Sequence, residues 1–410
     1  MYEMASSLGM NTNDMLWMAI VGQTDLLVHG RVDDAAYNFF VQHYNNAVLT
    51  LNADTPPRAR ADDGSGFVPA AEAGRIVFSH EYRLMMHRHW SLYESMFYSN
   101  YVASRLGVWR TNGEARLRNL LAEVGLSLVD ARQKFSFLRP REQRHLREQL
   151  ELRGPAQGLP DLLYGSFVRN CGFESPVSAA DIVYSVTALM EHTVRRGGPG
   201  SGGGGSSRDA GGGRAGGAGG EGEGQEEGED DSWLDSFNEA YDALAGRRAE
   251  PLRRGLELSM ALQKAMVQQA VSMVDKGALT PLKYFRYAYL HATEADERLF
   301  TQPVALAKLA AFLLEMHREN GKWVGAKAKP LVVLAERADQ RSYLVVGATG
   351  AERAGDVLKN RFGARFALAA AAANANANVR RDGFEASVIE VDRDHVQRFV
   401  EALHDNFSVR

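Results

Sequence analysis

Cysteine is nearly absent from this chain of 410 residues, because Cys171 is its single thiol. One cysteine excludes an intrachain disulfide framework and a cysteine-rich zinc site, and it fits a reducing compartment, the cytosol or the nucleus. Long apolar runs are missing too, since no stretch reaches the roughly 18 apolar residues that a membrane helix needs. The apolar run from Met15 to Val21 is short and follows an acidic residue, so the N-terminus does not resemble a signal peptide.

An excess of basic residues is also lacking. The formal net charge is -4, with 47 lysines and arginines against 51 aspartates and glutamates. The chain as a whole is therefore not a basic nucleic-acid binder, and any contact with DNA must come from a local patch. Hydrophobic residues make up 45% and charged residues 24%, which is typical of a globular protein with a core, and the length predicts two or three domains.

Composition changes sharply over residues 197–231, which are rich in glycine and end in a run of acids. This segment has no apolar periodicity, so it predicts a flexible linker with an acidic end. A solvated spacer is favoured over a partner-docking tail. Upstream of the linker the patterns are mainly helical, and downstream they alternate between strand and helix.

The upstream half predicts a series of helices. The features that indicate them are a short helix capped by Asn13 or Asp14, a helix over 35–49, a polar loop at 54–66, one apolar stripe through Tyr82, Met86, Trp90, Tyr93 and Phe97, a helix ended by Gly125, and a capping box of Ser178 and Asp181. Strands are hard to identify in this half, which is predicted to be mostly α.

The downstream half predicts a long helix from Pro251 to Asp275 that stops at Gly277. Aromatic and β-branched runs predict strands within 282–290, 330–336, 342–350 and 384–391. Helices are predicted over 301–317, 353–372 and 392–405. The fold class is therefore α/β with a large all-α portion.

The sequence offers few candidates for a catalytic or metal site. His87 and His89 would point about 200° apart on a helix and cannot share a metal. No G-x-S-x-G elbow is present, and the glycines of VVGATGAERAG match neither a dinucleotide fingerprint nor a P-loop. A tight strand-to-helix turn is the favoured interpretation of those glycines. The sequence therefore predicts no enzyme, no bound cofactor and no metal.

Two basic stretches remain. The run RPREQRHLREQLELR mixes arginines with glutamates, which is typical of a solvated helix face. Another lies nearer the C-terminus, where Phe362 and Phe366 are interleaved with bases, namely Arg353, Lys359, Arg361 and Arg365. Basic and aromatic residues together can track a single strand of nucleic acid, although core packing of the two phenylalanines with arginines at the surface is favoured.

Several segments together carry a resemblance. They are NDMLWMAIVGQTD, YRLMMHRHWSLYESMFYSNYVASRLGVW, FVRNCGFESPVSAADIVYSVTALME, LFTQPVALAKLAAFLLEMH, RSYLVVGATG and FEASVIEV. In this order they resemble the cell division control protein 45 family, and the resemblance covers nearly the whole chain except the loop near Pro56 and the glycine linker. The pair VGQTD and HWSLYESM is distinctive.

The resemblance implies a fold and a role. The family belongs to the DHH phosphoesterase superfamily and is related to the RecJ exonuclease, which implies four parts: residues 1–30 as the end of a DHH-like domain, 31–196 as a mainly helical interdomain, 197–231 as the linker and 232–410 as a DHHA1-like α/β domain. It also implies a non-catalytic subunit of the replicative helicase in the nucleus. The implied partners are the MCM hexamer, the GINS complex, single-stranded DNA, origin chromatin and a replicative polymerase, with no membrane. The alternative is a degenerate RecJ-like single-strand DNA phosphoesterase.

One position departs from the active relatives. Asp25, in the Gly22–Asp25 turn, matches the place where they hold a final metal-binding aspartate, but the other ligands would lie upstream, so a structural role for Asp25 is expected. The chain is accordingly expected to be an incomplete gene model or a truncated product, with Trp17, Ile20 and Val21 left as an exposed apolar patch.

Aromatic anchors complete the sequence-level expectations. Trp90, Tyr93 and Trp109 are candidate partner-binding residues, although for each of them a place in the core is the favoured alternative.

Overall fold

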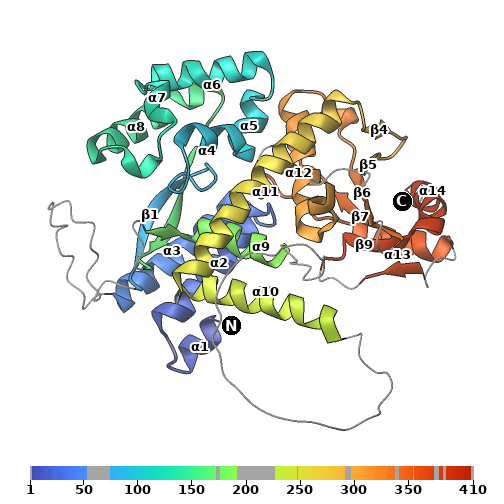
Figure 1. Ribbon diagram of the computed structural model, residues 1–410, viewed down its shortest axis with the longest axis horizontal. Helices are drawn as coiled ribbons and strands as arrows, with labels where there is room; N and C mark the ends of the chain where they lie inside the picture. Colours follow the sequence, from blue (N-terminus) through green and yellow to red (C-terminus); the bar gives the residue numbers. More distant parts are fainter. Residues whose placement is uncertain are drawn as a thin grey trace, which may run out of the picture.

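A long helix, α11 (Ala249–Asp275), runs diagonally through the computed structural model and joins the N-terminal part of the chain to the C-terminal part (Figure 1). The structure describes residues 2–52, 74–171, 176–191, 227–246, 248–290, 297–337, 341–353, 355–373, 378–381 and 385–407. The predicted polar loop at 54–66 and most of the predicted linker lie outside the described residues. Helix α11 confirms the long helix that was predicted from Pro251 to Asp275. Gly277 follows it with a left-handed φ of 65° and ends the helix as expected.

The N-terminal part contains helices on either side of a small sheet. Its elements are α1 (Tyr2–Ser7), α2 (Asn13–Val28), α3 (Asp34–Leu51), β1 (Ile76–Tyr82), β2 (Leu163–Arg169), β3 (Val177–Ser178), α9 (Ala179–Glu191) and α10 (Glu227–Ala245). Thr12 caps α2 by accepting a hydrogen bond from the amide of Met15, so the predicted caps Asn13 and Asp14 are one and two residues too late. Because α10 begins at Glu227, the last five residues of the predicted linker are helical.

The predicted exposure of the α2 apolar face is wrong. Trp17, Ile20 and Val21 are only 1, 1 and 7% exposed. They share a core cluster with Ile182 and Val183 of α9, which the chain supplies about 160 residues later. The apolar face of α2 is therefore covered by helices of this same chain, and the reason for expecting an exposed patch disappears.

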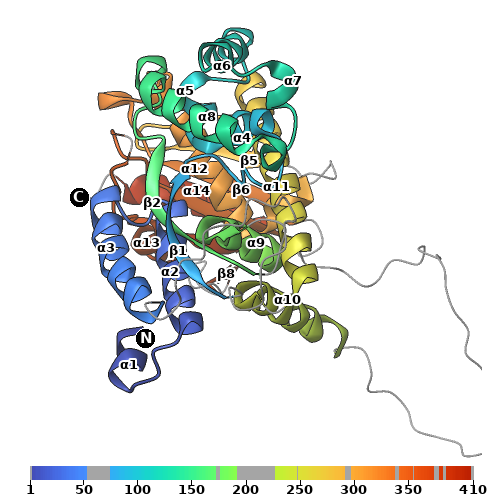
Figure 2. The same ribbon diagram turned by 90° about the vertical axis from the view of Figure 1, so that its left-hand side faces the viewer.

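A three-stranded antiparallel sheet in the order β1-β2-β3 lies within the half that was predicted to be mostly α. Ile76 pairs with Arg169 at one end of the β1–β2 ladder, and Tyr82 pairs with Leu163 at the other. In Figure 2 these two strands run together as long arrows from the lower helices toward the upper helical group. The sheet thus links the two helical regions of the N-terminal part.

The upper helical group is inserted between β1 and β2. It consists of α4 (Leu92–Tyr98), α5 (Asn100–Leu106), α6 (Thr111–Glu123), α7 (Leu128–Ala131), the 3-10 helix η2 (Phe135–Phe137), α8 (Pro140–Arg153) and the 3-10 helix η3 (Pro155–Gln157). The single helical stripe predicted from Tyr82 to Phe97 is wrong, because Tyr82 ends a strand and residues 83–91 form turns before α4 begins. Gly125 follows α6 with a φ of 82°, as predicted for a C-terminal glycine.

The C-terminal part contains a six-stranded sheet in the order β4-β5-β6-β7-β9-β8. Its elements are β4 (Thr280–Pro281), β5 (Arg286–Leu290), the 3-10 helix η4 (Glu297–Thr301), α12 (Pro303–Glu319), the 3-10 helix η5 (Gly325–Lys327), β6 (Leu331–Arg337), β7 (Ser342–Ala348), α13 (Phe362–Ala372), β8 (Val379–Arg380), β9 (Val388–Asp392), the 3-10 helix η8 (Arg393–His395) and α14 (Val396–Asn406). The pair β5–β6 is parallel, and the other pairs are antiparallel. The predicted strands are confirmed, and with them a mixed α/β fold with a large helical portion.

Side-chain alternation along β6 separates the two faces of this sheet. Leu331 and Val333 join the core cluster that contains α12, whereas Val332 and Leu334 join the cluster that contains Phe366 of α13 and α14 residues. All four strand side chains are 0% exposed. A strand buried on both faces reads as a continuous apolar run, which explains why the sequence revealed this strand clearly.

The helix predicted over 353–372 begins only at Phe362, and the predicted tight turn after β7 is wrong. Asn360 donates a hydrogen bond to the carbonyl of Gly347 and accepts one from the amide of Phe362, at 2.8 and 3.0 Å. The ring of Phe362 lies directly over Gly347, where an added Cβ would come within 2.2 Å of the ring. The glycine therefore allows the Phe362 ring to pack closely on β7.

No helix in the described part of the chain is long and apolar enough to cross a membrane.

Candidate functional site

A buried charge cluster joins β1, the turns after it and α9. Its members are Glu81, His87, Arg88, His89 and Asp181. The Nη1 atom of Arg88 donates to both carboxylate oxygens of Glu81 at 2.8 and 2.7 Å and lies 4.0 Å from Asp181. His87 Nδ1 lies 3.1 Å from Glu81, and His89 Nε2 lies 3.2 Å from Asp181. The two histidines thus contact different carboxylates, and they lie in turns and not on the helix that was expected there.

The electrostatics of this cluster favour two buried carboxylates in their charged form. Burial alone would raise the pKa of Glu81, but the charges of Arg88 and His87 outweigh it and hold that pKa below its ordinary value. Burial likewise opposes ionisation of Asp181, while His89 and Arg88 drive its pKa far below the usual range. Burial, followed by the charge of Arg88, lowers the pKa of His87. Arg88 is therefore the permanent cation of the cluster, and its charge favours ionisation of both carboxylates.

Asp181 has a second role at the start of α9. Its carboxylate accepts a hydrogen bond from the amide of Ser178, and the Ser178 hydroxyl accepts one from the amide of Asp181, both at 3.1 Å. This reciprocal pair confirms the predicted capping box. Because every carboxylate of the cluster is occupied by internal partners, its arrangement suits fixing the turns against α9 rather than binding a ligand.

Asp25, the position that matches a vestigial metal ligand, lies on α2 beside basic groups, so the Gly22–Asp25 segment is helical and not the turn that was expected. Its carboxylate is 3.0 Å from Nδ1 of His29. Burial opposes its ionisation, but the hydrogen bond with His29 and the charges of Arg31 and Lys308 hold its pKa below the ordinary value. Burial lowers the pKa of Lys308 to about 8, against the opposing charges of Glu191 and Asp25. Among the described residues, no group of three histidine, cysteine, aspartate or glutamate side chains is placed to hold a metal ion.

The three aromatic candidates differ in exposure. Trp90 is a core residue at 5% exposure, and its indole nitrogen donates to the carbonyl of Met85 at 2.7 Å. Tyr93 and Trp109 are half-buried. The Tyr93 hydroxyl donates to Glu114 at 3.0 Å, and the Trp109 ring packs edge-on against Phe312 of α12. Tyr93 and Trp109 thus stay partly exposed, and Trp90 does not.

The basic C-terminal candidates separate from the aromatic residues that accompany them in the sequence. Phe362 and Phe366 are buried in the sheet core at 1 and 0% exposure. Arg353, Lys359 and Arg361 are exposed. Arg365 is half-buried, with its guanidinium 3.7 Å from the centre of the Phe407 ring. The favoured interpretation, core phenylalanines beneath surface bases, is confirmed by these burials, and three cations remain accessible.

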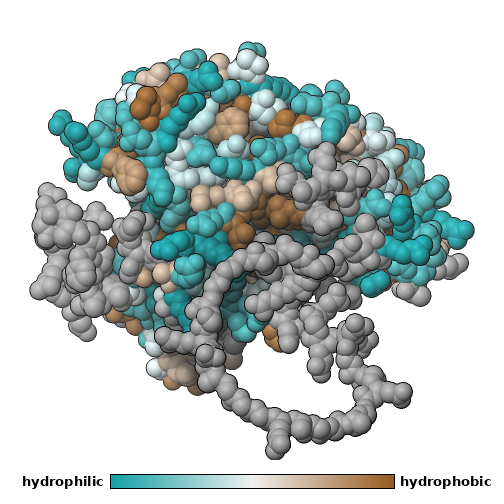
Figure 3. Space-filling view, viewed as in Figure 1, coloured by the Kyte–Doolittle hydropathy of each residue, from teal (hydrophilic) through white to brown (hydrophobic). Residues whose placement is uncertain are grey.

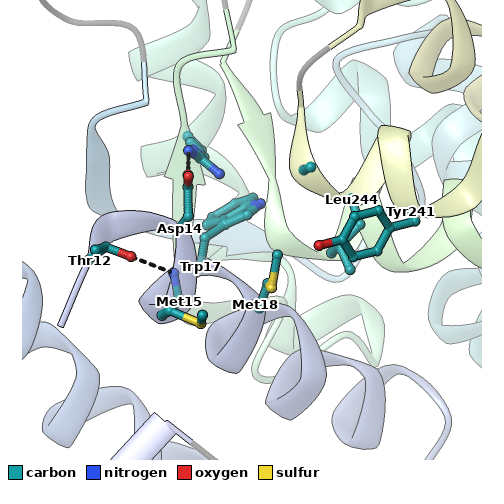
Figure 4. Close-up of a pocket in the computed structure, with 9 residues that line it drawn as sticks. Thr12, Asp14, Met15, Trp17, Met18, Tyr241 and Leu244 are labelled. Carbon is teal, nitrogen blue, oxygen red and sulfur yellow. Dashed lines mark hydrogen bonds and ion pairs between the residues drawn. The ribbon is translucent and has the colours of Figure 1, made fainter. Parts of the chain in front are cut away.

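A pocket of about 190 Å³ lies between α2 and α10 (Figure 4). Figure 4 shows Trp17 and Met18 of α2 on one side and Tyr241 and Leu244 of α10 on the other. At its edge the Asp14 carboxylate pairs with Arg169 of β2. Apolar side chains of α2 and α10 form two of its walls, and Thr12, Asp14 and Arg169 make the remaining edge polar, so the pocket has room for one side chain of a partner.

Exposed hydrophobic side chains mark a further surface on the upper helical group. Val129 of α7 and Phe137 of η2 are 72 and 71% exposed. Figure 3 shows hydrophobic residues over α7 within a hydrophilic surround. Exposed apolar side chains mark a candidate contact surface for another protein where they gather into one patch.

The buried charge cluster is the feature that sequence reasoning missed. A weak signal was present, since HEYRLMMHRHW interleaves Glu81 and Arg88 with large apolar side chains such as Leu84 and Trp90. Charged residues in an apolar stretch are rarely buried unless they are paired. Their partner Asp181 is 93 residues beyond Arg88 in the chain, so the pairing itself was not visible in the sequence.

Taken together, the two-part helical body, the bridging helix α11 and the six-stranded sheet define a mixed α/β protein class that has a solved representative. The crystal structure of CDC45 from Entamoeba histolytica aligns with a TM-score of 0.66 and 20% identity, covering 99% of this chain and 71% of that chain. At that identity the likeness shows a shared fold. The CDC45 family model matches residues 1–406, and the chain therefore belongs to the CDC45 family.

Curated relatives agree with this assignment and confirm the resemblance found in the sequence. The cell division control protein 45 homolog of Schizosaccharomyces pombe is 33% identical over 98% of this chain and 62% of its own length. The homologs of Dictyostelium discoideum and Homo sapiens are 30 and 28% identical, with 60 and 64% of their own lengths covered. The chain thus spans about three-fifths of the length of these relatives.

Proposed function

We propose that this chain is a non-catalytic structural subunit of the eukaryotic replicative helicase, required for initiation of DNA replication, origin unwinding and fork progression. The observation that carries the proposal is the family match over residues 1–406. In this role the chain acts in the nucleus, binds the MCM hexamer and GINS at origin chromatin, and cooperates with a replicative polymerase. The division into a DHH-like end, a helical interdomain and a DHHA1-like domain stays a prediction of the same proposal.

The surroundings of Asp25 support a non-catalytic role. A divalent cation at this carboxylate would face the charges of Arg31 and Lys308, which already influence it. Catalytic metal sites of phosphoesterases need several carboxylates or histidines around each ion, whereas His29 is the residue bonded to Asp25 here. Asp25 is better suited to anchoring α2 beside α12 than to holding a metal pair.

A manganese-dependent nuclease assay separates this role from the alternative of a degenerate RecJ-like phosphoesterase. The purified chain is incubated with single-stranded DNA, alongside the Asp25→Ala variant. We expect no degradation by either protein. Degradation by the wild type that disappears in Asp25→Ala, with an unchanged thermal melt, would establish the phosphoesterase instead.

The upper helical group is the surface that we propose for MCM or GINS. Tyr93 and Trp109 offer half-buried rings there, and Val129 and Phe137 add exposed apolar side chains. Large rings with fixed supports lose little freedom on binding, which is why aromatic residues often dominate the binding energy of interfaces. The core residue Trp90 supports this group from inside by stacking on Tyr98.

Single-stranded DNA is proposed to contact Arg353, Lys359 and Arg361, whose side chains are exposed. Fluorescence anisotropy with an oligothymidine probe at several salt concentrations tests this. If all three cations contact phosphates, their joint replacement by glutamine should reduce the slope of log affinity against log salt by about 2, since each contact contributes about 0.7. An unchanged slope would place the DNA elsewhere. The conservative control is Arg141→Gln, an exposed arginine of the mixed-charge helix α8.

Reconstitution tests the proposal as a whole. Purified MCM hexamer and GINS are mixed with the chain, and unwinding of a forked DNA is measured with and without it. We expect stimulation that survives Asp25→Ala within twofold. No association and no stimulation would refute the helicase role.

A further inference from the structure

Helix α10 carries a stripe of apolar side chains that are about half exposed. Trp233, Leu234, Phe237 and Tyr241 are 53, 41, 47 and 42% exposed. Residues three, four and eight positions apart lie along one side of a helix, and the rings of Phe237 and Tyr241 stack at 6.5 Å with an interplanar angle of 16°. In Figures 1 and 2 the N-terminal half of α10 projects beyond α9, and Trp233 and Leu234 belong to that half.

The buried face of α10 is formed by small residues instead. Ala240 and Ala243 are 3 and 0% exposed within the cluster that α2, α9 and α11 share. Glu239 of α10 also pairs with Arg254 of α11 at 3.0 Å. Because these contacts hold the helix in place, removal of the exposed rings should leave the fold intact.

Charge on α10 has one sign. Its 19 residues contain seven aspartates and glutamates and no lysine or arginine, and four of those acids precede Trp233. Asp235 is exposed between Trp233 and Phe237. Glu239 and Asp242 pair with Arg254 and Arg248, so Asp235 is the exposed acid beside the anchors among the described side chains, and it disfavours an anionic partner such as DNA. A complementary surface must therefore be basic as well as apolar.

The stripe continues into the pocket between α2 and α10. Tyr241 is both a member of the stripe and a wall of that pocket, and Met15, at the pocket's other side, is 41% exposed. A partner that covers the stripe can thus insert one apolar side chain between the two helices. The surface therefore combines a row of apolar side chains along α10 with the pocket between α2 and α10.

We propose that α10 is a docking helix whose apolar stripe binds a protein groove rimmed by lysine or arginine, and that a subunit of the helicase assembly supplies this groove. The proposal rests on the function proposed above and adds the chemistry of one contact. Binding by an amphipathic helix laid in an apolar groove is a common mode of recognition, read from anchors spaced three or four residues apart. The acids beside the anchors set the sign of the partner's rim.

The test uses the whole chain and a purified MCM–GINS assembly as the binding probe. Affinity is measured for the wild type, for Trp233→Ala/Phe237→Ala, and for Phe39→Ala as a matched control, since Phe39 is an exposed ring on α3 at 69%. We expect the double variant to bind about 30-fold more weakly, the control within twofold of the wild type, and thermal melts of all three to coincide. Asp235→Lys should also weaken binding, and the loss of affinity should be larger at low salt than at high salt.

Two outcomes overturn the inference. If the wild type binds and the double variant binds equally well, α10 is not the docking helix, and the proposed function stands. If the wild type does not bind the assembly at all, the proposed function fails and this inference fails with it. A photo-crosslinker in place of Phe237 adds an independent readout: we expect attachment to a partner segment flanked by lysine or arginine, and attachment to an acidic segment would contradict the charge argument.

Discussion

Replacing Arg88 by methionine should strongly destabilise the fold, because it removes the cation between two buried carboxylates. Glu81 and Asp181 are each 3% exposed. Methionine retains most of the apolar volume of the arginine side chain but cannot donate the two hydrogen bonds at 2.8 and 2.7 Å to Glu81. Breaking a buried ion pair on one side leaves an uncompensated charge and costs about 3–5 kcal/mol. We expect a loss of that size at pH 7.

The assay is urea denaturation followed by tryptophan fluorescence and circular dichroism, with the free energy of unfolding taken from both signals. Arg118→Met is the matched control, because Arg118 pairs with Glu114 on the surface of α6 with its side chain 50% exposed. An exposed pair of this spacing is screened by solvent and contributes little to stability. The difference between the two variants measures what burial adds to an ion pair.

The pH dependence of the Arg88 variant supplies a second check. In the wild type the pKa values of Glu81 and Asp181 are lowered, so their stabilisation is present above the unfolded values near about 4 and is lost as pH falls through the folded values. In Arg88→Met the unpaired carboxylates of Glu81 and Asp181 can lose their charge by binding a proton. The destabilisation should therefore shrink as pH is lowered from 7 toward 4. A loss below about 1 kcal/mol at pH 7, or one that grows in acid, would refute the account of this cluster.

Four further substitutions test the packing and the charges. Gly347→Ala should destabilise the fold by about 1–3 kcal/mol, because the added Cβ would lie within 2.2 Å of the Phe362 ring. Gly22→Ala on α2 should stabilise it by about 0.5–1 kcal/mol, because the added Cβ meets no atom within 4 Å. Thermal melts of the two variants check this contrast. Trp17→Ala should cost about 3–5 kcal/mol in a urea titration, and a loss near zero would contradict the burial of α2. Burial lowers the pKa of Lys308 to about 8, so the unfolded chain binds more protons above that pH; relative to Lys308→Met, wild-type stability should rise between about pH 8 and 10, and a flat difference would contradict it.

The C-terminal sheet was predicted well because each of its central strands is an apolar run that can be recognised without knowing its neighbours. β6 and β7 are runs of valine and leucine that need both faces covered, and no helix of that length and composition competes with them. The start of α13 was less accessible to prediction. Residues 353–361 continue an apolar and basic pattern, but the helix begins where Phe362 docks over Gly347, and that contact depends on a strand 15 residues earlier.

The errors in the N-terminal half have the same physical origin. β1 was missed because IVFSHEY is followed by aromatic residues at helical spacing, so a local period of 3.6 concealed a strand whose pairing partner β2 lies about 80 residues away. Burial of Trp17 likewise depends on α9, which no local pattern around α2 reveals. The predicted site residues show the same limit, since Trp90 and Tyr93 look alike in sequence but only Trp90 is enclosed.

The most direct test of the central claim is affinity purification of the endogenous protein from replicating cells, followed by quantitative mass spectrometry. If the chain is a structural subunit of the replicative helicase, MCM and GINS subunits should be recovered in amounts close to equimolar with it, and more strongly in S phase than in arrested cells. Recovery of the protein without MCM and GINS, under conditions that preserve the helicase from the same cells, would contradict the claim.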